Sequence, residues 1–392
     1  MLFKYLLGNI FYFISYVIPK SKNIWIFGSW GGKNFSDNPK YFYNYIKINH
    51  TNITPVWLSV NRELIKELKN KGHYIYHTYS VLGIWYSSRA LVGIVSHGLV
   101  DINRFACARM NIVQTWHGIP MKPVLLSDPK IQAKVKRSKL LNLRYIFPFL
   151  RKELLYDRNL IICSTSMHVE HLLGKVFGAN APLYNVGFPR LDGLFNPSKD
   201  NSIFKEIDNH KKDGKQVGVY MPTYRREGEF DIIAYLMQNK IEIEETLLIN
   251  NSIIYLKIHP YDYFKIKDKF QSKTIRLIED KLIDSDIYKI LGSFDFLISD
   301  YSSVVFDFLI LNKPVYLLVP DRKEYISSNG KFIYDYVNIG IPEGNTWSKM
   351  LDLISNKKTI TNLNTISIKY HQNRDCKNSE RLFLAIKSKL NK

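Results

Sequence analysis

The chain has 392 residues, of which 46% are hydrophobic, and its formal net charge is +20. This length and apolar content are sufficient for two domains of ordinary size, and the charge predicts a polyanionic partner such as nucleic acid, an anionic membrane surface or a phosphorylated substrate. The sequence has no zinc-finger spacing, RNA-binding signature or basic heptads, so nucleic acid is the disfavoured partner. Three widely separated cysteines with no CxxC pair favour a reducing, cytoplasmic setting without a disulfide framework.

The first predicted element is an apolar helix over Leu2–Ile18, with lysines in and beside it. The run is slightly short for a membrane span, and two polar residues interrupt it. It also lacks the basic start and the small-residue cleavage site of a signal peptide. A helix lying in the membrane interface, with aromatic rings at headgroup depth, is the favoured interpretation. A buried helix of the first domain is the alternative.

A strand over Asn23–Gly28 then leads into a glycine-rich turn at Ser29–Lys33. The sequence Ser36-Asp37-Asn38-Pro39 is typical of a helix start, with Asp37 or Asn38 as the cap and Pro39 in the first turn. This strand–turn–helix order is able to cradle a phosphate, although it matches neither a GxGxxG fingerprint nor a P-loop.

The strand over Asn111–Trp116 runs directly into His117-Gly118-Ile119-Pro120. A histidine on a sharp turn at the carboxyl end of a strand lies at the edge where α/β sheets bind ligands. Its ordinary, near-neutral pKa suits a general base that takes a proton from a hydroxyl. A purely structural histidine is the alternative. A denser basic tract at 130–152 is expected to be a solvated face.

Polar and charged composition around 196–215 predicts a linker, after which a second domain begins. Three of its predicted strands precede candidate phosphate ligands, namely Arg225 after 216–221, His259 after 253–258, and Ser302 with Ser303 after 294–299. The carboxyl ends of parallel strands share one edge, so an Arg fork, an imidazole and the start of a helix would together hold a pyrophosphate there. Helix capping is the alternative role of the two serines.

Seven short motifs follow one another along the chain: GSW…SDNPKYFY at Gly28–Tyr43, QTWHGIPMK at Gln114–Lys122, GFPRLD at Gly187–Asp192, YMPTYR at Tyr220–Arg225, LKIHP at Leu256–Pro260, ISDYSSVVFDF at Ile298–Phe308 and DCKNSER at Asp375–Arg381. Together they resemble the CDP-glycerol glycerophosphotransferases that build teichoic acids and related capsule polymers. The chain departs from the commoner family pattern at Ile119, Tyr224 and Cys376, where Thr, Trp and Gly are frequent.

The resemblance implies an α/β, GT-B-like fold of two doubly wound parallel-sheet domains facing a central cleft, and the alternation of strand-like and helix-like runs agrees with it. We expect a membrane-associating helix at 1–20, an acceptor-binding domain over 21–205 and a CDP-alcohol-binding domain over 206–370. A C-terminal helix over 371–392 is a candidate to pack back on the first domain.

The resemblance also implies the chemistry. His117 matches the proposed catalytic base, and it would deprotonate a hydroxyl that attacks the β-phosphorus of CDP-glycerol, so that CMP leaves. The predicted ligands of the donor phosphates are His259, Ser302, Ser303 and, by extension, Arg225. Candidate acceptor or cleft residues are Asp37, Lys122 and Arg190.

The implied partners are CDP-glycerol, a lipid-linked saccharide or polyol-phosphate acceptor and the anionic cytoplasmic face of the bacterial membrane. No cofactor is required. A divalent metal is compatible with the sequence but not indicated by it, because no DxD-like cluster follows a strand. Asp300 and Asp307 are expected to have capping or structural roles.

Two other function classes stay open. A GT-B glycosyltransferase that uses a nucleotide sugar would share the fold, although the joint HGxPxK and DYSS motifs argue against it. A non-catalytic, membrane-docked module for anionic polymers would explain the charge but not the positions of His117, Arg225 and His259. Within the favoured family, CDP-ribitol as donor, primase or polymerase action and the oligomeric state are also open.

Overall fold

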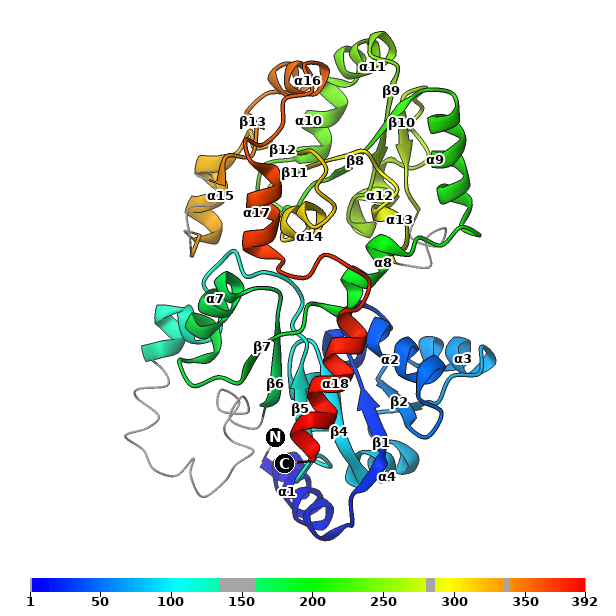
Figure 1. The fold of residues 1–392 in the computed structure, drawn as a ribbon, viewed down its shortest axis with the longest axis vertical. Helices are drawn as coiled ribbons and strands as arrows, with labels where there is room; N and C mark the ends of the chain where they lie inside the picture. Colours follow the sequence, from blue (N-terminus) through cyan, green and yellow to red (C-terminus); the bar gives the residue numbers. More distant parts are fainter. Residues whose placement is uncertain (1, 134–158, 280–285, 331, 334–338, 392) are drawn as a thin grey trace. The chain divides into compact units, whose positions relative to one another are not determined.

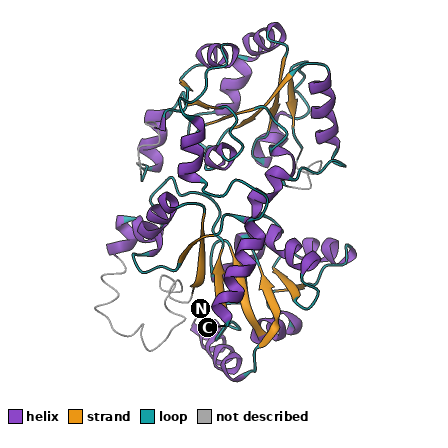
Figure 2. Cartoon of the chain, viewed as in Figure 1, coloured by secondary structure: helices purple, strands orange, loops and turns teal. Residues whose placement is uncertain are grey.

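The computed structural model describes residues 2–133, 159–279, 286–330, 332–333 and 339–391 (Figure 1). The chain forms two compact units. The first contains Met1–His117, Val124–Asp192 and Lys377–Lys392, and the second contains Gly118–Pro123 and Gly193–Cys376. In each unit helices pack around a sheet (Figure 2).

The first unit has a seven-stranded sheet in the order β3-β2-β1-β4-β5-β6-β7, and its paired strands are parallel. Its strands are β1 (Ser21–Phe27), β2 (Thr54–Ser59), β3 (Ile75–His77), β4 (Ala90–Val95), β5 (Asn111–Gln114), β6 (Asn159–Ser164) and β7 (Leu183–Asn185). The strand order reverses between β1 and β4, and in such sheets a ligand crevice lies at the carboxyl ends of the strands on either side of the reversal.

Three helices of this unit begin after a residue whose side chain satisfies their first N–H groups. Asn61, Ser80 and Ser166 each accept backbone hydrogen bonds at a helix start. The α-helices are α1 (Leu2–Val17), α2 (Asp37–Asn49), α3 (Arg62–Asn70), α4 (Val81–Arg89), α7 (Met167–Phe177) and α18 (Asn378–Leu390). Short 3-10 turns are η1 (Trp30–Gly32), η2 (Leu99–Asp101), η3 (Leu125–Ser127) and η6 (Pro189–Leu191).

The C-terminal helix α18 is attached to the first unit through Asp192. This carboxylate accepts hydrogen bonds from the backbone N–H groups of Asn378 (2.8 Å) and Ser379 (2.9 Å) and from the Ser379 hydroxyl (2.6 Å). A carboxylate at a helix start satisfies otherwise unpaired N–H groups and complements the helix dipole. The last segment of the chain thereby completes the unit in which the chain begins.

Helix α1 has one anchored face and one exposed apolar face. The Ser15 hydroxyl accepts from the Ala108 N–H (3.2 Å), and Arg109 donates to the Tyr16 carbonyl (3.1 Å). The other face exposes large apolar side chains at Ile10, Phe11, Phe13, Ile14, Tyr16 and Val17. Among the described residues, no helix is long and apolar enough to cross a membrane.

The second unit has a six-stranded sheet in the order β10-β9-β8-β11-β12-β13, again with parallel pairs. Its strands are β8 (Gln216–Met221), β9 (Ser252–Leu256), β10 (Ile275–Leu277), β11 (Phe296–Ser299), β12 (Val315–Leu318) and β13 (Glu343–Gly344). The order reverses between β8 and β11, so the sequences after these two strands meet at one crevice.

Helices cover this second sheet, and the core of the unit is formed by residues of both the strands and the helices. The helices are α8 (Asp192–Phe195, whose first residue still belongs to the first unit), α9 (Ser202–Lys212), α10 (Ile232–Gln238), α11 (Lys240–Ile249), α12 (Pro260–Ile266), α13 (Tyr288–Leu291), α14 (Val304–Leu309), α15 (Arg322–Asn329), α16 (Trp347–Ser355) and α17 (Leu363–Tyr370). Strand residues such as Leu256 and Ile298 pack with helix residues such as Leu236 and Trp347 in one buried cluster.

The predicted fold class of two parallel-sheet α/β units is confirmed. The short strands β3 and β13 were not predicted, because two or three residues carry too little periodicity to be distinguished from a loop. The interval 196–215, predicted as a linker, contains helix α9. Residues 134–152 of the basic tract lie outside the described residues.

Candidate active site

The turn after β5 holds His117 on a strained backbone. Trp116, the preceding residue, has φ 56°, a left-handed conformation that is an outlier for a bulky side chain. The Asn38 side-chain amide donates to the carbonyl oxygens of Thr115 (3.2 Å) and Trp116 (2.8 Å). Such strain persists where surrounding contacts fix the backbone, and it is concentrated at functional turns.

Asp37 and Arg190 form a buried ion pair beside this turn. Arg190 Nη1 donates to Asp37 Oδ1 over 2.6 Å, and each side chain is only 5% exposed. The Arg190 backbone N–H also donates to Asn38 Oδ1 (3.0 Å). Because the two charged groups are enclosed and bonded to each other, this geometry favours a role in holding Asn38 and the turn over direct acceptor contact.

His117 lies face to face with His97. Their ring centroids are 4.2 Å apart and their planes differ by 2°. His117 Nδ1 lies 3.3 Å from the carbonyl oxygen of Ser96. A carbonyl oxygen only accepts, so Nδ1 carries the ring hydrogen and Nε2 presents its lone pair. No group in the described part of the chain bonds to that Nε2 atom, so it is available to take a proton.

Burial lowers the pKa of His117 to about 4. His97 and Arg190 contribute to this lowering of the pKa, whereas Asp37 and the hydrogen bond to Ser96 act in the opposite direction. The near-neutral pKa expected from the sequence is therefore corrected downward, because desolvation penalises the charged imidazolium. At pH 7 the imidazole is neutral, the form in which it accepts a proton.

Asp101 joins the two loops at the reversal point of the first sheet. Its fully buried carboxylate accepts from the backbone N–H groups of Gly31 (2.7 Å), Ser96 (2.8 Å) and His97 (2.7 Å). Gly31 follows β1, and the other two residues follow β4. The carboxylate therefore fixes the backbone of His97, the residue that stacks on His117.

Asp300 has the equivalent position in the second sheet. It is fully buried and accepts from the Thr223 N–H (2.9 Å), the Thr223 hydroxyl (2.6 Å) and Arg225 Nη2 (2.9 Å). Thr223 follows β8 and Asp300 follows β11, so this carboxylate also bridges the reversal point. Burial raises the pKa of Asp300, while Arg225 and Thr223 act in the opposite direction.

Arg225 is held by protein acceptors. Besides its bond to Asp300, Nε and Nη2 donate to Asp321 (2.7 and 3.2 Å), and Nη1 donates to the Thr223 carbonyl (2.6 Å). Its guanidinium also lies over the rings of Tyr301 (5.0 Å) and Tyr325 (4.7 Å). With only 7% of the residue exposed, this geometry favours a positioning role over the predicted contact with the donor phosphates.

His259 differs from His117 in exposure and in the state of its ring. It is exposed at the start of α12, where its Nδ1 accepts from the Tyr261 N–H (3.3 Å). An accepting Nδ1 carries no hydrogen, so in the neutral ring Nε2 is the donor. The Tyr224 ring lies against it, with centroids 4.4 Å apart. His259 therefore presents an N–H group where His117 presents a lone pair.

The two predicted serines lie at the start of α14. The Ser302 hydroxyl accepts from the Val304 N–H (3.4 Å), a long capping bond, and Ser303 is the residue before the helix. Lys122, predicted as an acceptor or cleft residue, donates to the Tyr325 hydroxyl (2.6 Å) and lies 4.4 Å above that ring. Burial and the nearby Arg225 lower the pKa of Lys122.

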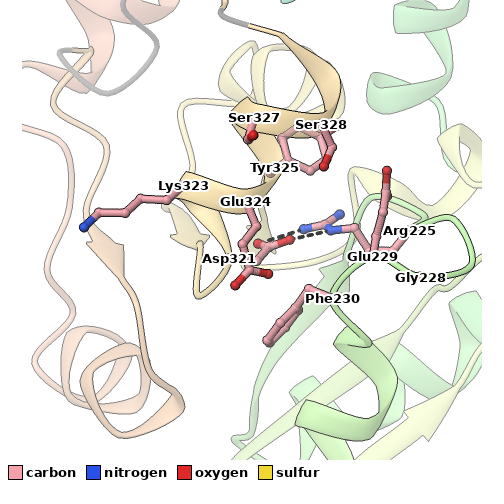
Figure 3. Close-up of a pocket in the computed structure, with 10 residues that line it drawn as sticks. All are labelled: Arg225, Gly228, Glu229, Phe230, Asp321, Lys323, Glu324, Tyr325, Ser327 and Ser328. Carbon is pink, nitrogen blue, oxygen red and sulfur yellow. Dashed lines mark hydrogen bonds and ion pairs between the residues drawn. The ribbon is translucent and has the colours of Figure 1, made fainter.

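A pocket of about 530 Å³ lies beside Arg225 between the loop after β8 and helix α15 (Figure 3). It is lined by Arg225, Gly228, Glu229, Phe230, Asp321, Lys323, Glu324, Tyr325, Ser327 and Ser328. In Figure 3 the Arg225 guanidinium points toward the Asp321 carboxylate, and Lys323 extends away from the other side chains. Three carboxylates and three hydroxyl groups thus line the pocket together with Arg225 and Lys323, and its volume is in the range of small-molecule sites.

Asn38, Asp101 and Asp321 were not predicted as site residues, and Asn38 was expected only as a candidate helix cap. Asn38 and Arg190 are 152 residues apart, and Asp321 and Arg225 are 96 residues apart. For the two aspartates, the only signal in the sequence was their position shortly after the strand-like runs at 90–96 and 315–319. Across the described ranges, no group of three or more His, Cys, Asp or Glu side chains is arranged to hold a metal ion.

Comparison with known proteins identifies the family. The sequence profile described as CDP-Glycerol:Poly(glycerophosphate) glycerophosphotransferase matches residues 10–388, so the chain belongs to this family, as its motifs predicted. The chain is 27% identical over 333 residues to the teichoic acid poly(glycerol phosphate) polymerase of Staphylococcus epidermidis and 26% identical over 324 residues to that of Bacillus subtilis. Each alignment covers 81% of this chain, which spans less than half of either relative, 43% and 42% respectively.

The fold is shared with a solved structure of the wall teichoic acid polymerase TagF. The superposition has a TM-score of 0.74 at 20% sequence identity and covers 100% of this chain and 97% of the other. The predicted GT-B-like pair of parallel-sheet units is thus confirmed, whereas membrane contact by α1 stays a prediction.

We predict that Arg225→Met lowers the free energy of unfolding by about 3–5 kcal/mol, because it leaves two buried carboxylates without their cation. Chemical denaturation of the purified variant measures the loss. Arg226→Met, at the exposed neighbouring position, is the matched control and should stay near wild type. A stable Arg225→Met protein that loses only donor binding would instead support direct phosphate contact.

We predict that His97→Asn raises the pKa of His117, because it removes a neighbouring group that holds this pKa down. A base acts in its neutral form, so the acid limb of the kcat/KM profile should move to higher pH by roughly one unit. His77→Asn, on strand β3, should leave the limb in place. An unshifted acid limb in a folded His97→Asn variant would contradict this coupling.

Proposed function

We propose that the chain transfers glycerol phosphate from CDP-glycerol to a hydroxyl of a lipid-linked saccharide or polyol-phosphate acceptor and releases CMP, in the synthesis of wall teichoic acid or a related capsule polymer. Family membership supports the donor class. The observation that carries the proposal is the opposite hydrogen placement on two histidines at strand ends. His117 offers a lone pair, and His259 offers an N–H group.

In the proposed reaction His117 Nε2 accepts the proton of the acceptor hydroxyl as its oxygen attacks the β-phosphorus of CDP-glycerol. A new P–O bond forms, and the bond between the β-phosphorus and the oxygen bridging to the α-phosphate breaks, so CMP leaves with that oxygen. The protonated imidazole is stabilised by the negative charge of the bound phosphates, which raises its pKa from the low resting value. The first unit thus supplies acceptor activation.

The proposed donor ligands are in the second unit. His259 Nε2–H donates to a phosphate oxygen, and Ser302 and Ser303 offer hydroxyls at the start of α14. Arg225 acts as a positioning residue, since Asp300 and Asp321 already hold its guanidinium. The carboxylate-rich pocket beside it suits the uncharged polyol end of the donor better than the pyrophosphate, because carboxylates repel phosphate and accept hydroxyl hydrogens.

The proposed location is the cytoplasmic face of the cell membrane, with α1 in the interface. Its exposed apolar face and the net charge of +20 support contact with an anionic bilayer.

The central test is CMP release from CDP-glycerol in the presence of a detergent-solubilised acceptor. His117→Ala should lower turnover by about 10²–10⁴-fold while CDP-glycerol binding, measured by calorimetry, is retained. His171→Ala, an exposed histidine on α7, is the control. Product mass separates one added glycerol phosphate from a ladder, and CDP-ribitol is run in parallel. No CMP from either donor would favour the nucleotide-sugar alternative and a screen of UDP-sugars.

His259→Asn tests the donor side separately. Asparagine retains an oxygen that can cap α12, so the variant should fold normally, but its shorter amide does not reach the position of the imidazole Nε2–H. We expect kcat/KM for CDP-glycerol to fall by about 10²-fold, the usual cost of one missing donor to a developing charge. His210→Asn on α9 is the matched control and should leave kcat/KM for CDP-glycerol unchanged. Unchanged kinetics in His259→Asn would remove this residue from the donor site.

A further inference from the structure

An indole ring is exposed beside the two stacked histidines. Trp30, in the turn η1 after β1, is 48% exposed. Its ring centroid lies 4.5 Å from that of His97 and 6.4 Å from that of His117. The His97 and His117 rings are parallel, and the Trp30 ring is tilted by about 50° to both, so the indole flanks the imidazole pair.

Exposure alone does not distinguish this residue, since isolated exposed apolar side chains are common. Trp85 on α4 is 50% exposed, and the Arg89 guanidinium lies 5.4 Å from its ring centroid. In the described part of the chain, by contrast, no lysine or arginine lies over the Trp30 ring.

The backbone of the turn is fixed from two directions. Trp30 has φ 50°, and both following glycines are also left-handed, at 65° and 75°. Asp101 accepts from the Gly31 N–H (2.7 Å), and the Gly32 carbonyl accepts from the Ser59 hydroxyl (2.6 Å) and the Val60 N–H (2.8 Å). A left-handed tryptophan is unfavourable without such support. The fold therefore holds an open aromatic face next to the base.

The surroundings indicate what this face binds. The cation next to His117, Arg190, is buried and paired with Asp37, so its charge is already compensated by a protein carboxylate. A pyranose ring has a face of C–H groups that packs on an indole and an edge of hydroxyl groups. One ring lying on Trp30 would place an edge hydroxyl toward His117 Nε2, whereas an acyclic polyol phosphate offers no flat face and carries charge.

We propose that Trp30 forms an acceptor subsite for a neutral sugar ring, and that the hydroxyl deprotonated by His117 belongs to that ring. This inference rests on the proposed function and narrows its acceptor from a saccharide or polyol phosphate to a saccharide. Trp30 is a binding residue in this assignment, and His97 supports its indole from the side.

The test compares two acceptor classes on the full-length chain with CDP-glycerol as donor. One class is a panel of alkyl hexosides and alkyl N-acetylhexosaminides, and the other is an oligo(glycerol phosphate) carrying the same alkyl tail. We expect wild type to release CMP with a glycoside, and Trp30→Ala to raise the KM of that glycoside about tenfold with the KM of CDP-glycerol unchanged. Trp30→Phe, which retains an aromatic face, should raise the KM of the glycoside by less than Trp30→Ala does.

Trp85→Ala is the matched control for loss of an exposed tryptophan and should behave as wild type; thermal unfolding of Trp30→Ala checks that the turn still folds. CMP release with oligo(glycerol phosphate) alone or with neither class, or an unchanged glycoside KM in Trp30→Ala, would overturn the subsite. A raised KM for CDP-glycerol would also overturn it and assign the indole to the cytosine ring. Failure of the proposed function is distinct, because wild type would then not bind CDP-glycerol in calorimetry.

Discussion

In each of the two parallel sheets, a buried carboxylate at the reversal point is the interaction on which the loops that carry the candidate site residues depend. Loops that leave the carboxyl ends of adjacent strands carry backbone N–H groups that no strand partner satisfies. Asp101 accepts three of them in the first sheet, and Asp300 accepts an N–H, a hydroxyl and a guanidinium in the second. Burying a charge is costly, and these hydrogen bonds offset that cost while fixing the loops that carry His97, Trp30 and Arg225.

The two histidines show how backbone partners decide side-chain chemistry. In each ring, the group that faces Nδ1 determines whether Nε2 acts as an acceptor or as a donor. The Ser96 carbonyl oxygen faces Nδ1 of His117, so Nε2 of that ring is basic. The Tyr261 N–H faces Nδ1 of His259, so Nε2 of that ring is a donor. In the proposed reaction, one residue type would thereby serve two tasks of phosphoryl transfer, namely proton removal by His117 and charge stabilisation by His259.

The buried ion clusters have a different purpose from the exposed basic surface. Arg190 with Asp37, and Arg225 with Asp300 and Asp321, are nearly enclosed and satisfied by one another. Such clusters add little net stability compared with apolar packing, but breaking one is expensive, so they hold a single arrangement of loops. The remaining positive charge of the chain acts at longer range and suits an anionic donor and an anionic membrane.

Much of this protein was predictable from its sequence. The α/β class, most strands, the family and the strand-end positions of His117, His259 and Ser302 follow from local periodicity and short motifs, since those depend on neighbouring residues. Local sequence does not determine whether a polar side chain is available to a ligand or already bonded within the protein. Arg225 and Arg190 were predicted to contact substrate, but the tertiary structure buries both in ion pairs. Their partners Asp321 and Asp37 are 96 and 153 residues away along the chain, so no local pattern indicates these pairs. Only strand order brings such partners together, and strand order is set by the packing of the whole sheet and not by any local pattern.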